Sequence, residues 1–208
     1  MAKRLMDITL IAAALFVLLP ILLGIVVLVR MALGSPVLFR QTRIGLNGQP
    51  FTMYKFRTML NTTCRDGTLL HDAQRVTTVG RLLRRSSLDE LPELFNVLRG
   101  EMSLVGPRPL LPQYVDRYTE YQFRRHEVLP GITGWAQVNG RNLISWEERF
   151  QYDVWYVDHW SVGFDIKILG LTAWNVLIRK GVSPDGQETM DEFLGVQTTE
   201  GSVKRNNP

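Results

Sequence analysis

The dominant feature of the hydrophobic pattern is an uncharged segment from Ile8 to Val29, which is 22 residues long. As a helix it would extend about 33 Å, enough to cross a hydrocarbon core of about 30 Å. Arg30 follows it directly, without the small-residue pattern of a cleavage site, which argues against a cleaved signal peptide. The segment therefore predicts a membrane-embedded helix, and a buried core helix is the least favoured alternative.

Two features of this segment argue against a simple crossing. Pro20 lies in its interior, where proline removes a hydrogen bond and bends a helix. Both flanks are basic, with Lys3 and Arg4 before the segment and Arg30 after it, so the positive charges give no clear orientation. A helix that enters the membrane, bends and returns to the same face would fit both features. A kinked spanning helix is the commoner class and is favoured on physical grounds alone.

The rest of the pattern alternates between strand-like and helix-like segments. Residues 51–56 alternate between apolar and polar side chains after the turn signal of residues 46–49, which predicts a strand beside that turn. Ser145 and Glu148 have the spacing of a capping box at a helix start. Further helices are predicted at 76–85, 91–98, 116–127 and 165–180. This pattern predicts a mixed α/β, mainly helical fold, in which the last helix lies in the core or on the membrane surface.

Composition narrows the class of partner. The chain has 208 residues with 24 Lys and Arg against 20 Asp and Glu, a net charge of +4. That modest excess suits an anionic membrane surface or a phosphate-bearing substrate, and no dense basic block or nucleic-acid module is present. Cys64 is the single cysteine and the three histidines are scattered, so an internal disulfide is excluded and a zinc site is disfavoured. A reducing, cytoplasmic environment fits this composition.

The chemistry-bearing part of the sequence is the carboxylate pair Asp89 and Glu90, which follows a run of arginines. One interpretation is structural, because Ser87 and Glu90 have the spacing of a capping box. Pro92 would then fall inside the helix, where its ring clashes with the backbone. If Asp89 is the cap instead, Pro92 lies in the first turn and the free N–H groups of the helix could hold a phosphate. Function and capping have equal weight on these residues alone.

Several cations could serve an anionic substrate beside this pair. Arg84 precedes it, Arg108 lies between two prolines that fix its backbone, and Arg141 follows a tight-turn signal. Rigid arginines beside two carboxylates suit phosphate chemistry, because a carboxylate can attack phosphorus once Mg²⁺ and arginines neutralise the charge. Lys55 by itself fits a solvated strand face.

These motifs occur together in one family. The chain resembles the small monotopic phosphoglycosyl transferases, bacterial sugar transferases that start the assembly of membrane-linked glycans. The resemblance extends from Lys3 to about Gly186 and rests on several strings in the family's order. The strings are Tyr54-Lys55-Phe56-Arg57-Thr58-Met59, Ser87-Leu88-Asp89-Glu90-Leu91-Pro92, Asn96-Val97-Leu98-Arg99-Gly100, Met102-Ser103-Leu104-Val105-Gly106-Pro107-Arg108-Pro109, Pro130-Gly131-Ile132-Thr133-Gly134 and Gln137-Val138-Asn139-Gly140-Arg141-Asn142.

The resemblance implies an overall organisation. Residues 1–30 would form a re-entrant membrane helix broken at Pro20, residues 31–196 a cytosolic catalytic domain with amphipathic interfacial helices, and residues 197–208 a polar, disordered tail. This reverses the preference for a spanning helix and agrees with the two basic flanks. It implies a monotopic protein at the cytoplasmic face of a bacterial inner membrane. Family members often have a serine before the proline, where this chain has Leu19.

The resemblance also implies a reaction. The family transfers a phospho-sugar from a UDP-sugar to polyprenyl (undecaprenyl) phosphate, releases UMP, and works by a ping-pong course through a phospho-sugar on an aspartate. That nucleophile corresponds to Asp89, and the neighbouring metal-associated glutamate corresponds to Glu90, with Mg²⁺ as cofactor and Asp89 as a further metal ligand. The family's remaining active-site positions correspond to Lys55, Arg84, Arg108, Arg141 and Asp165, the last with no assigned role.

Three alternatives stay open. Both carboxylates could bind Mg²⁺ while the polyprenyl phosphate attacks directly in a ternary complex. The chain could be a membrane-anchored anion-binding scaffold in which Asp89 and Glu90 only cap a helix. A nucleic-acid-binding protein is the weakest alternative, since the sequence has a long apolar segment and lacks a nucleic-acid module. The sequence does not determine which sugar is carried, and it leaves a homodimer open.

Overall fold

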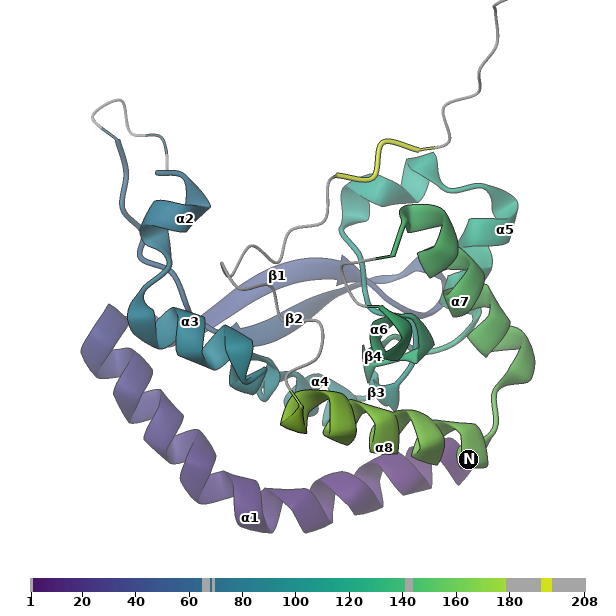
Figure 1. Ribbon diagram of the computed structural model, residues 1–208, viewed down its shortest axis with the longest axis horizontal. Coiled ribbons are helices and arrows are strands. Elements are labelled where there is room, and N and C mark those ends of the chain that lie inside the picture. Colours follow the sequence, from purple (N-terminus) through teal and green to yellow (C-terminus); the bar gives the residue numbers. More distant parts are fainter. Residues whose placement is uncertain (1, 65–67, 69, 141–143, 179–191, 196–208) are drawn as a thin grey trace, which may run out of the picture.

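The computed structural model describes residues 2–64, 68, 70–140, 144–178 and 192–195. Within these residues helices surround two small sheets of two strands each, which confirms the predicted mixed, mainly helical class (Figure 1). Arg141, Lys180 and the predicted tail at 197–208 lie outside the described residues.

Helix α1 (Ala2–Leu33) is the longest element, and it curves along one side of the molecule (Figure 1). Pro20 lies inside this helix without ending it. By length and composition α1 could cross a membrane. Its middle part is uncovered, with Phe16 89% and Leu23 59% exposed, so the alternative of a buried core helix is wrong.

Both ends of α1 pack against the rest of the protein. Near the amino end, Ile11 is buried in a cluster with Val97 and Met102. Near the carboxyl end, Val29 is buried in a second cluster that includes Leu83. The same folded unit therefore holds the helix at two separate places, and its apolar middle extends between them.

Strands β1 (Leu38–Ile44) and β2 (Pro50–Phe56) form an antiparallel hairpin. The turn between them contains the short helix η1 (Leu46–Gly48), in which Asn47 and Gly48 have positive φ angles of 53° and 75°. Asparagine and glycine adopt this left-handed region most easily, so the predicted turn and strand are confirmed with their physical cause.

The next segment contains the predicted carboxylate pair. Its elements are α2 (Asp72–Arg75), α3 (Thr78–Arg85), η2 (Leu88–Glu90) and α4 (Glu93–Arg99). The helices predicted at 76–85 and 91–98 are confirmed as α3 and α4, with slightly shorter bounds. Gly100 ends α4 in the left-handed conformation at φ 84°.

Neither predicted cap begins α4. Pro92 occupies the N-cap position, and Ser87 makes no side-chain cap bond and has φ 55°. The chain makes a separate 3-10 turn at Leu88–Glu90, and α4 begins only after Pro92. The interpretation of Asp89 or Ser87 as the cap of this helix is therefore wrong.

The single helix predicted at 116–127 is also wrong. The structure divides this region into η3 (Pro112–Arg117), α5 (Glu120–Phe123) and η4 (Arg124–Glu127). Thr119 forms a capping box with Gln122, which starts a new helix in the middle of the predicted one.

The remaining elements are β3 (Ser103–Val105), β4 (Gly131–Thr133), α6 (Trp135–Asn139), α7 (Trp146–His159) and α8 (Val162–Leu177). Strands β3 and β4 pair in parallel. The predicted capping box of Ser145 and Glu148 starts α7. Helix α8 leaves Trp174 60% and Leu177 77% exposed, which gives this helix an uncovered apolar surface.

Candidate active site

Two cations from separate elements converge on Glu90. Lys55 on β2 places its Nζ 2.5 Å from Glu90 Oε1. Arg108, which follows β3, donates to the same oxygen. Lys55 Nζ also lies 3.3 Å from Oε1 of Glu93 on α4, an ion-pair contact without hydrogen-bond geometry. We call Lys55, Glu90, Glu93 and Arg108 the charged cluster.

Burial and charge have different net effects on the two glutamates. Burial acts to raise the pKa of Glu90, but the charges of Arg108 and Lys55 outweigh it and hold that pKa well below its ordinary value. Burial and the negative charge of Glu90 raise the pKa of Glu93 to about 7. Glu90 is therefore ionised at neutral pH, whereas the Glu93 carboxyl binds a proton far more readily than an ordinary glutamate.

Asp89 precedes Glu90 in the same 3-10 turn and is only 8% exposed. The turn is short, so the nucleophile implied by the family resemblance lies one residue from the carboxylate that binds both cations. An acidic residue that is neither solvated nor the cap of α4 fits a chemical role better than a capping one.

Arg84 reaches the segment after β2 rather than Glu90 in the described contacts. Its Nε donates to the hydroxyl of Thr58 at 3.0 Å. Helix α3 can approach Thr58 because it has Gly80 at the contact, where a Cβ atom would lie 1.9 Å from the Thr58 carbonyl oxygen. Gly80 in the first turn of α3 and Arg84 near its carboxyl end thus both contact Thr58, and α3 is followed by the turn that contains Asp89.

Asn96 holds α4 against β2. Its Oδ1 accepts a hydrogen bond from Tyr54 N at 3.2 Å, and its Nδ2 donates to Thr52 O at 2.7 Å. The side chain is fully buried, so water does not compete for these hydrogen bonds. Lys55 follows Tyr54 on β2, and Glu93 precedes Asn96 on α4. The hydrogen bonds of Asn96 therefore hold Glu93 in position relative to Lys55.

A buried ion pair supports the backbone of Arg108. Arg125 donates to the Arg108 carbonyl oxygen at 2.7 Å and to Asp153 Oδ2, also at 2.7 Å. Both side chains of the Arg125–Asp153 pair are almost fully buried. The flanking prolines and this bond together fix the position of the Arg108 backbone.

A cavity of about 320 Å³ opens beside the charged cluster. Glu90, Arg108 and Arg149 line its polar side, and Leu94 and Leu169 are among its apolar lining residues. Its volume is at the small end of the range for ligand pockets, and its mixture of apolar walls with a few charged groups is typical of them.

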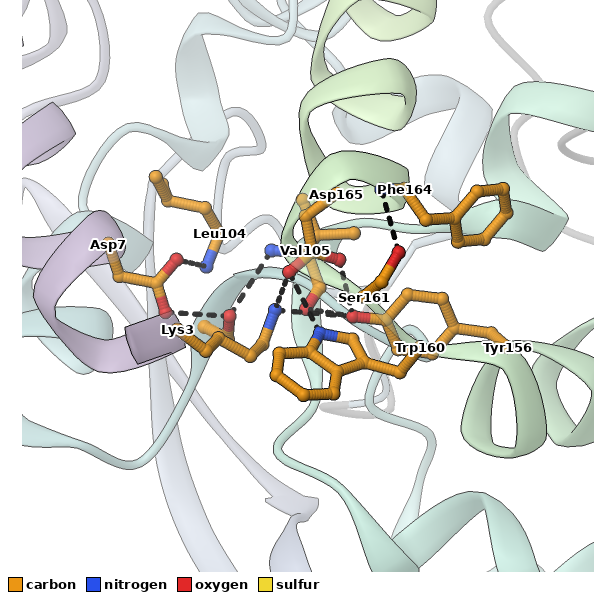
Figure 2. A network of polar contacts seen from close by, with 10 residues as sticks. Lys3, Asp7, Leu104, Val105, Tyr156, Trp160, Ser161, Phe164 and Asp165 are labelled. Atoms are coloured by element: carbon orange, nitrogen blue, oxygen red, sulfur yellow. Dashed lines mark hydrogen bonds and ion pairs between the residues drawn. The ribbon is translucent and has the colours of Figure 1, made fainter. Parts of the chain in front are cut away.

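Asp165 lies in a different network, at the start of α8 (Figure 2). Its fully buried carboxylate accepts hydrogen bonds from Tyr156 at 2.7 Å and Trp160 at 3.0 Å, and it pairs with Lys3 at 2.5 Å. Burial and the Asp165 charge raise the pKa of Tyr156. In the described contacts the structure does not bring Asp165 to the charged cluster.

The same end of α1 makes a second buried contact, shown in Figure 2. Asp7 is 1% exposed and accepts from the Ser103 hydroxyl at 2.7 Å and from Leu104 N at 3.3 Å. These residues belong to or adjoin β3, which leads to Arg108. The amino end of α1 is thus bonded directly to the segment that supplies an arginine of the charged cluster.

A family model described as bacterial sugar transferase matches residues 1–179. The chain belongs to the bacterial sugar transferase family. It is 55% identical over 196 residues to an uncharacterized sugar transferase, EpsL, of Bacillus subtilis, covering 93% of this chain and 96% of that protein.

Relatives with more specific names are longer. The transferase is 47% identical to a UDP-glucose:undecaprenyl-phosphate glucose-1-phosphate transferase of Xanthomonas campestris, over 86% of this chain and 39% of that protein. It is 40% identical to an undecaprenyl-phosphate galactose phosphotransferase of Salmonella typhimurium, over 71% of this chain and 35% of that protein. The chain thus spans well under half of these two relatives.

The carboxylates of the transferase suit a Mg²⁺ ion for which a substrate supplies some of the ligands. Among the described residues no group of three or more His, Cys, Asp or Glu side chains could hold a metal. Mg²⁺ is commonly bound by one or two carboxylates together with phosphate oxygens and water. Glu90 lines the cavity and is ionised, so the donor chemistry fits, and the cofactor stays a prediction.

Sequence reasoning missed three parts of this site of the transferase. Glu93 was assigned only to a helix, although it lies 3.3 Å from Lys55. Arg125 and Arg149 were not singled out, because the sequence indicated only a helix at 116–127 and a helix start at Ser145 for their segments. Their burial, at 2% and 8% exposed, depends on tertiary packing, which no local pattern encodes. The predicted Arg141 lies outside the described residues.

Proposed function

We propose that the chain transfers a phospho-sugar from a UDP-sugar to polyprenyl phosphate and releases UMP, as the first membrane step of bacterial glycoconjugate synthesis. The observation that carries the proposal is the convergence of Lys55 and Arg108 on Glu90, one residue from Asp89. Two cations held in place beside a carboxylate pair suit a diphosphate substrate. The names of the relatives, which describe transfer of sugar phosphates to undecaprenyl phosphate, support the same reaction.

The proposed reaction has two displacements at one phosphorus atom. In the first, a carboxylate oxygen of Asp89 attacks the phosphorus that bears the sugar, and the bond from that phosphorus to the oxygen of UMP breaks. UMP leaves with the bonding electrons, and a phospho-sugar remains on Asp89. In the second, an oxygen of polyprenyl phosphate attacks the same phosphorus and releases the Asp89 carboxylate.

The charged cluster has a defined part in this scheme. Arg108 and Lys55 bind and orient the phosphates and offset the negative charge that would otherwise repel the Asp89 carboxylate. Bound Mg²⁺, held with help from Glu90 and Asp89, would supply further neutralisation of the diphosphate. Glu90 stays ionised through the reaction because its pKa is held low by both cations.

We further infer that α1 is re-entrant and that the protein is monotopic at the cytoplasmic face of the inner membrane. The support is geometric: Ile11 and Val29, near opposite ends of α1, are buried against the same folded unit. A polar folded unit does not lie on both sides of a bilayer, so a helix held in this way would enter and leave by one face. Pro20 and the exposed apolar middle of the helix fit the bend.

The exposed apolar surface of α8 fits the same arrangement. Ile166, Trp174 and Leu177 are each at least 59% exposed, and tryptophan is favoured at the level of the lipid headgroups. A helix lying in the interface beside the cavity would bring the active site to the depth of a polyprenyl phosphate headgroup.

The deciding experiment measures UMP release from a panel of UDP-sugars with polyprenyl phosphate and Mg²⁺. Wild type should release UMP with at least one donor, and Asp89→Asn should release none while remaining folded and membrane-bound. Asp116→Asn, the same change at an exposed position, is the matched control. Turnover retained in Asp89→Asn would exclude Asp89 as the nucleophile.

A trapping experiment separates the ping-pong course from a ternary complex. Enzyme incubated with a donor labelled in the sugar and without acceptor should gain the mass of one phospho-sugar on the peptide that contains Asp89. An enzyme that releases UMP only when the acceptor is present, and never carries the label, would follow the direct ternary-complex mechanism instead.

Topology is tested with cysteines. Cys64 is exposed and reports the side of the folded unit, and Ala2→Cys in a Cys64→Ser background reports the side of the amino end. A membrane-impermeant thiol reagent should label both from the cytoplasmic face only. Labelling of the two cysteines from opposite faces would show a spanning helix and reject the re-entrant proposal.

A further inference from the structure

Arg149 is a buried cation on the wall of the cavity that no step above uses. It lies on α7, is 8% exposed, and lines the same cavity as Glu90 and Arg108. Burial lowers its pKa to about 10; the charge of Asp153 acts to raise it, and the positive charges of Arg108 and Arg125 act to lower it. At neutral pH the guanidinium nevertheless remains fully charged.

A charged guanidinium with little access to water loses hydration free energy. A lysine in this position could become neutral, but an arginine cannot do so at neutral pH. The carboxylate of Asp153 offsets part of this cost, and an anion that enters the cavity would offset more of it. The position thus favours an anionic ligand at the Arg149 side of the cavity.

The local fold aims this side chain before any ligand arrives. The guanidinium carbon lies 5.1 Å from the centre of the Trp146 ring, a cation–π contact that restricts the side chain. The capping box of Ser145 and Glu148 fixes the start of α7 directly before Arg149. A group held in this way loses little conformational entropy on binding.

Nearby positive charge strengthens the preference for an anion. Arg43 adds positive charge near Arg108: burial and the charge of Arg108 lower the pKa of Arg43 to about 10. The carboxylate of Asp153, which adjoins this region, accepts two hydrogen bonds from Arg125. Arg108 and Arg149 both line one small cavity, and Glu90 is the acidic side chain among its lining residues.

We propose that Arg149 binds a phosphate group of a substrate in the cavity that Arg108 also lines. The inference rests on the proposed function, which supplies two sources of that phosphate: the diphosphate of the UDP-sugar and the monophosphate of the polyprenyl acceptor. Both have the same recognition chemistry, an oxyanion that accepts paired N–H bonds from a guanidinium. Arg149 is thus a substrate-binding residue whose role the two halves of the reaction can assign.

The test uses Arg149→Met and Arg149→Lys in the full chain. For a donor phosphate, Arg149→Met should raise the donor KM for phospho-sugar loading, measured without acceptor, by about 10- to 100-fold, from the loss of charged hydrogen bonds. For an acceptor phosphate, loading should be unchanged and the acceptor KM should rise by the same factor. Arg149→Lys should recover part of the loss, because it keeps the charge without the planar fork.

Arg124→Met, which changes an exposed cation that does not line the cavity, is the control. An independent readout is stabilisation by inorganic pyrophosphate, which should raise the thermal midpoint of wild type and of Arg124→Met more than that of Arg149→Met. Unchanged KM values for donor and acceptor together with an unchanged pyrophosphate response would overturn the inference. Absence of UMP release in wild type itself would reject the proposed function, whereas the pyrophosphate response would still decide whether Arg149 binds phosphate.

Discussion

Lys55 and Glu90 are 35 residues apart in the sequence, and their charged atoms lie 2.5 Å apart. This contact joins the hairpin of β1 and β2 to the turn that contains Asp89. Local structure alone does not bring these two residues together, since Lys55 belongs to a strand and Glu90 to a 3-10 turn. The candidate active site is therefore assembled by the packing of α4 and its preceding turn on the hairpin.

Replacing Lys55 by methionine should reduce kcat for UMP release by at least about 100-fold, because a fixed cation beside the reacting phosphates is lost. Arg40→Met changes an exposed cation on the neighbouring strand and should leave kcat within about twofold. Steady-state kinetics with saturating acceptor would measure both. Full activity in Lys55→Met would remove the charged cluster from the catalytic site.

The raised pKa of Glu93 predicts that the stability of the folded protein depends on pH. That pKa is raised from 4.5 to about 7, so the folded protein binds an extra proton between these values and its stability falls as pH rises through this window. The shift corresponds to at most about 3 kcal/mol. Glu93→Gln should remove this loss, so its thermal midpoint should decrease less than that of wild type between pH 5 and pH 8.

Glu147→Gln, at an exposed position of α7, controls for the change of net charge. Its midpoint should follow the wild-type pH dependence. If Glu93→Gln also follows wild type, the proton on Glu93 does not contribute to stability.

Two glycines in helices should respond in opposite directions to alanine. Gly80→Ala would place a Cβ atom 1.9 Å from the Thr58 carbonyl oxygen, so α3 must move and both stability and UMP release should fall. Gly170→Ala on α8 meets nothing within 4 Å and should stabilise the protein by about 0.5 to 1 kcal/mol through helix propensity. Thermal unfolding of both variants in the same detergent checks the contrast, and equal effects would contradict it.

The contact between Lys3 and Asp165 should hold the amino end of α1 in place. Asp165→Asn leaves the Lys3 ammonium without its buried counter-charge and should destabilise the protein by about 3 kcal/mol. The double variant Lys3→Met with Asp165→Asn should be more stable than Asp165→Asn alone. Thermal unfolding and the rate of proteolysis near the amino end would measure the effect.

Asp158→Asn is the matched control, since it removes an exposed ion pair with Arg124. Its thermal midpoint should be close to that of wild type, because exposed pairs contribute little. If Asp165→Asn behaves like this control, Asp165 has no role in anchoring α1.

Sequence reasoning located most helices and the hairpin because their signals are local. The Asn47 turn, the Ser145 capping box and the Gly100 helix end each act through the residue itself or a near neighbour. Two errors concern where helices start: α4 begins only after Pro92, and Thr119 starts a new helix within the one predicted at 116–127.

The site was less accessible from the sequence. Lys55 alone fits a solvated strand face, and only the packing of α4 reveals its two glutamate neighbours. The flanking prolines already indicated Arg108 and the family resemblance supplied Lys55, whereas Glu93 and Arg149 needed the structure. Buried charges are hard to predict in this way, because their positions depend on partners far along the chain.

The support of α1 at both ends has a consequence for lipid dependence. A spanning helix must match the thickness of the bilayer and tilts or deforms its surroundings when it does not. In a re-entrant α1, the contacts of Ile11 and Val29 fix the depth of the helix from one surface only. The far leaflet then imposes no length requirement, and the enzyme should work equally well in membranes of short and long acyl chains.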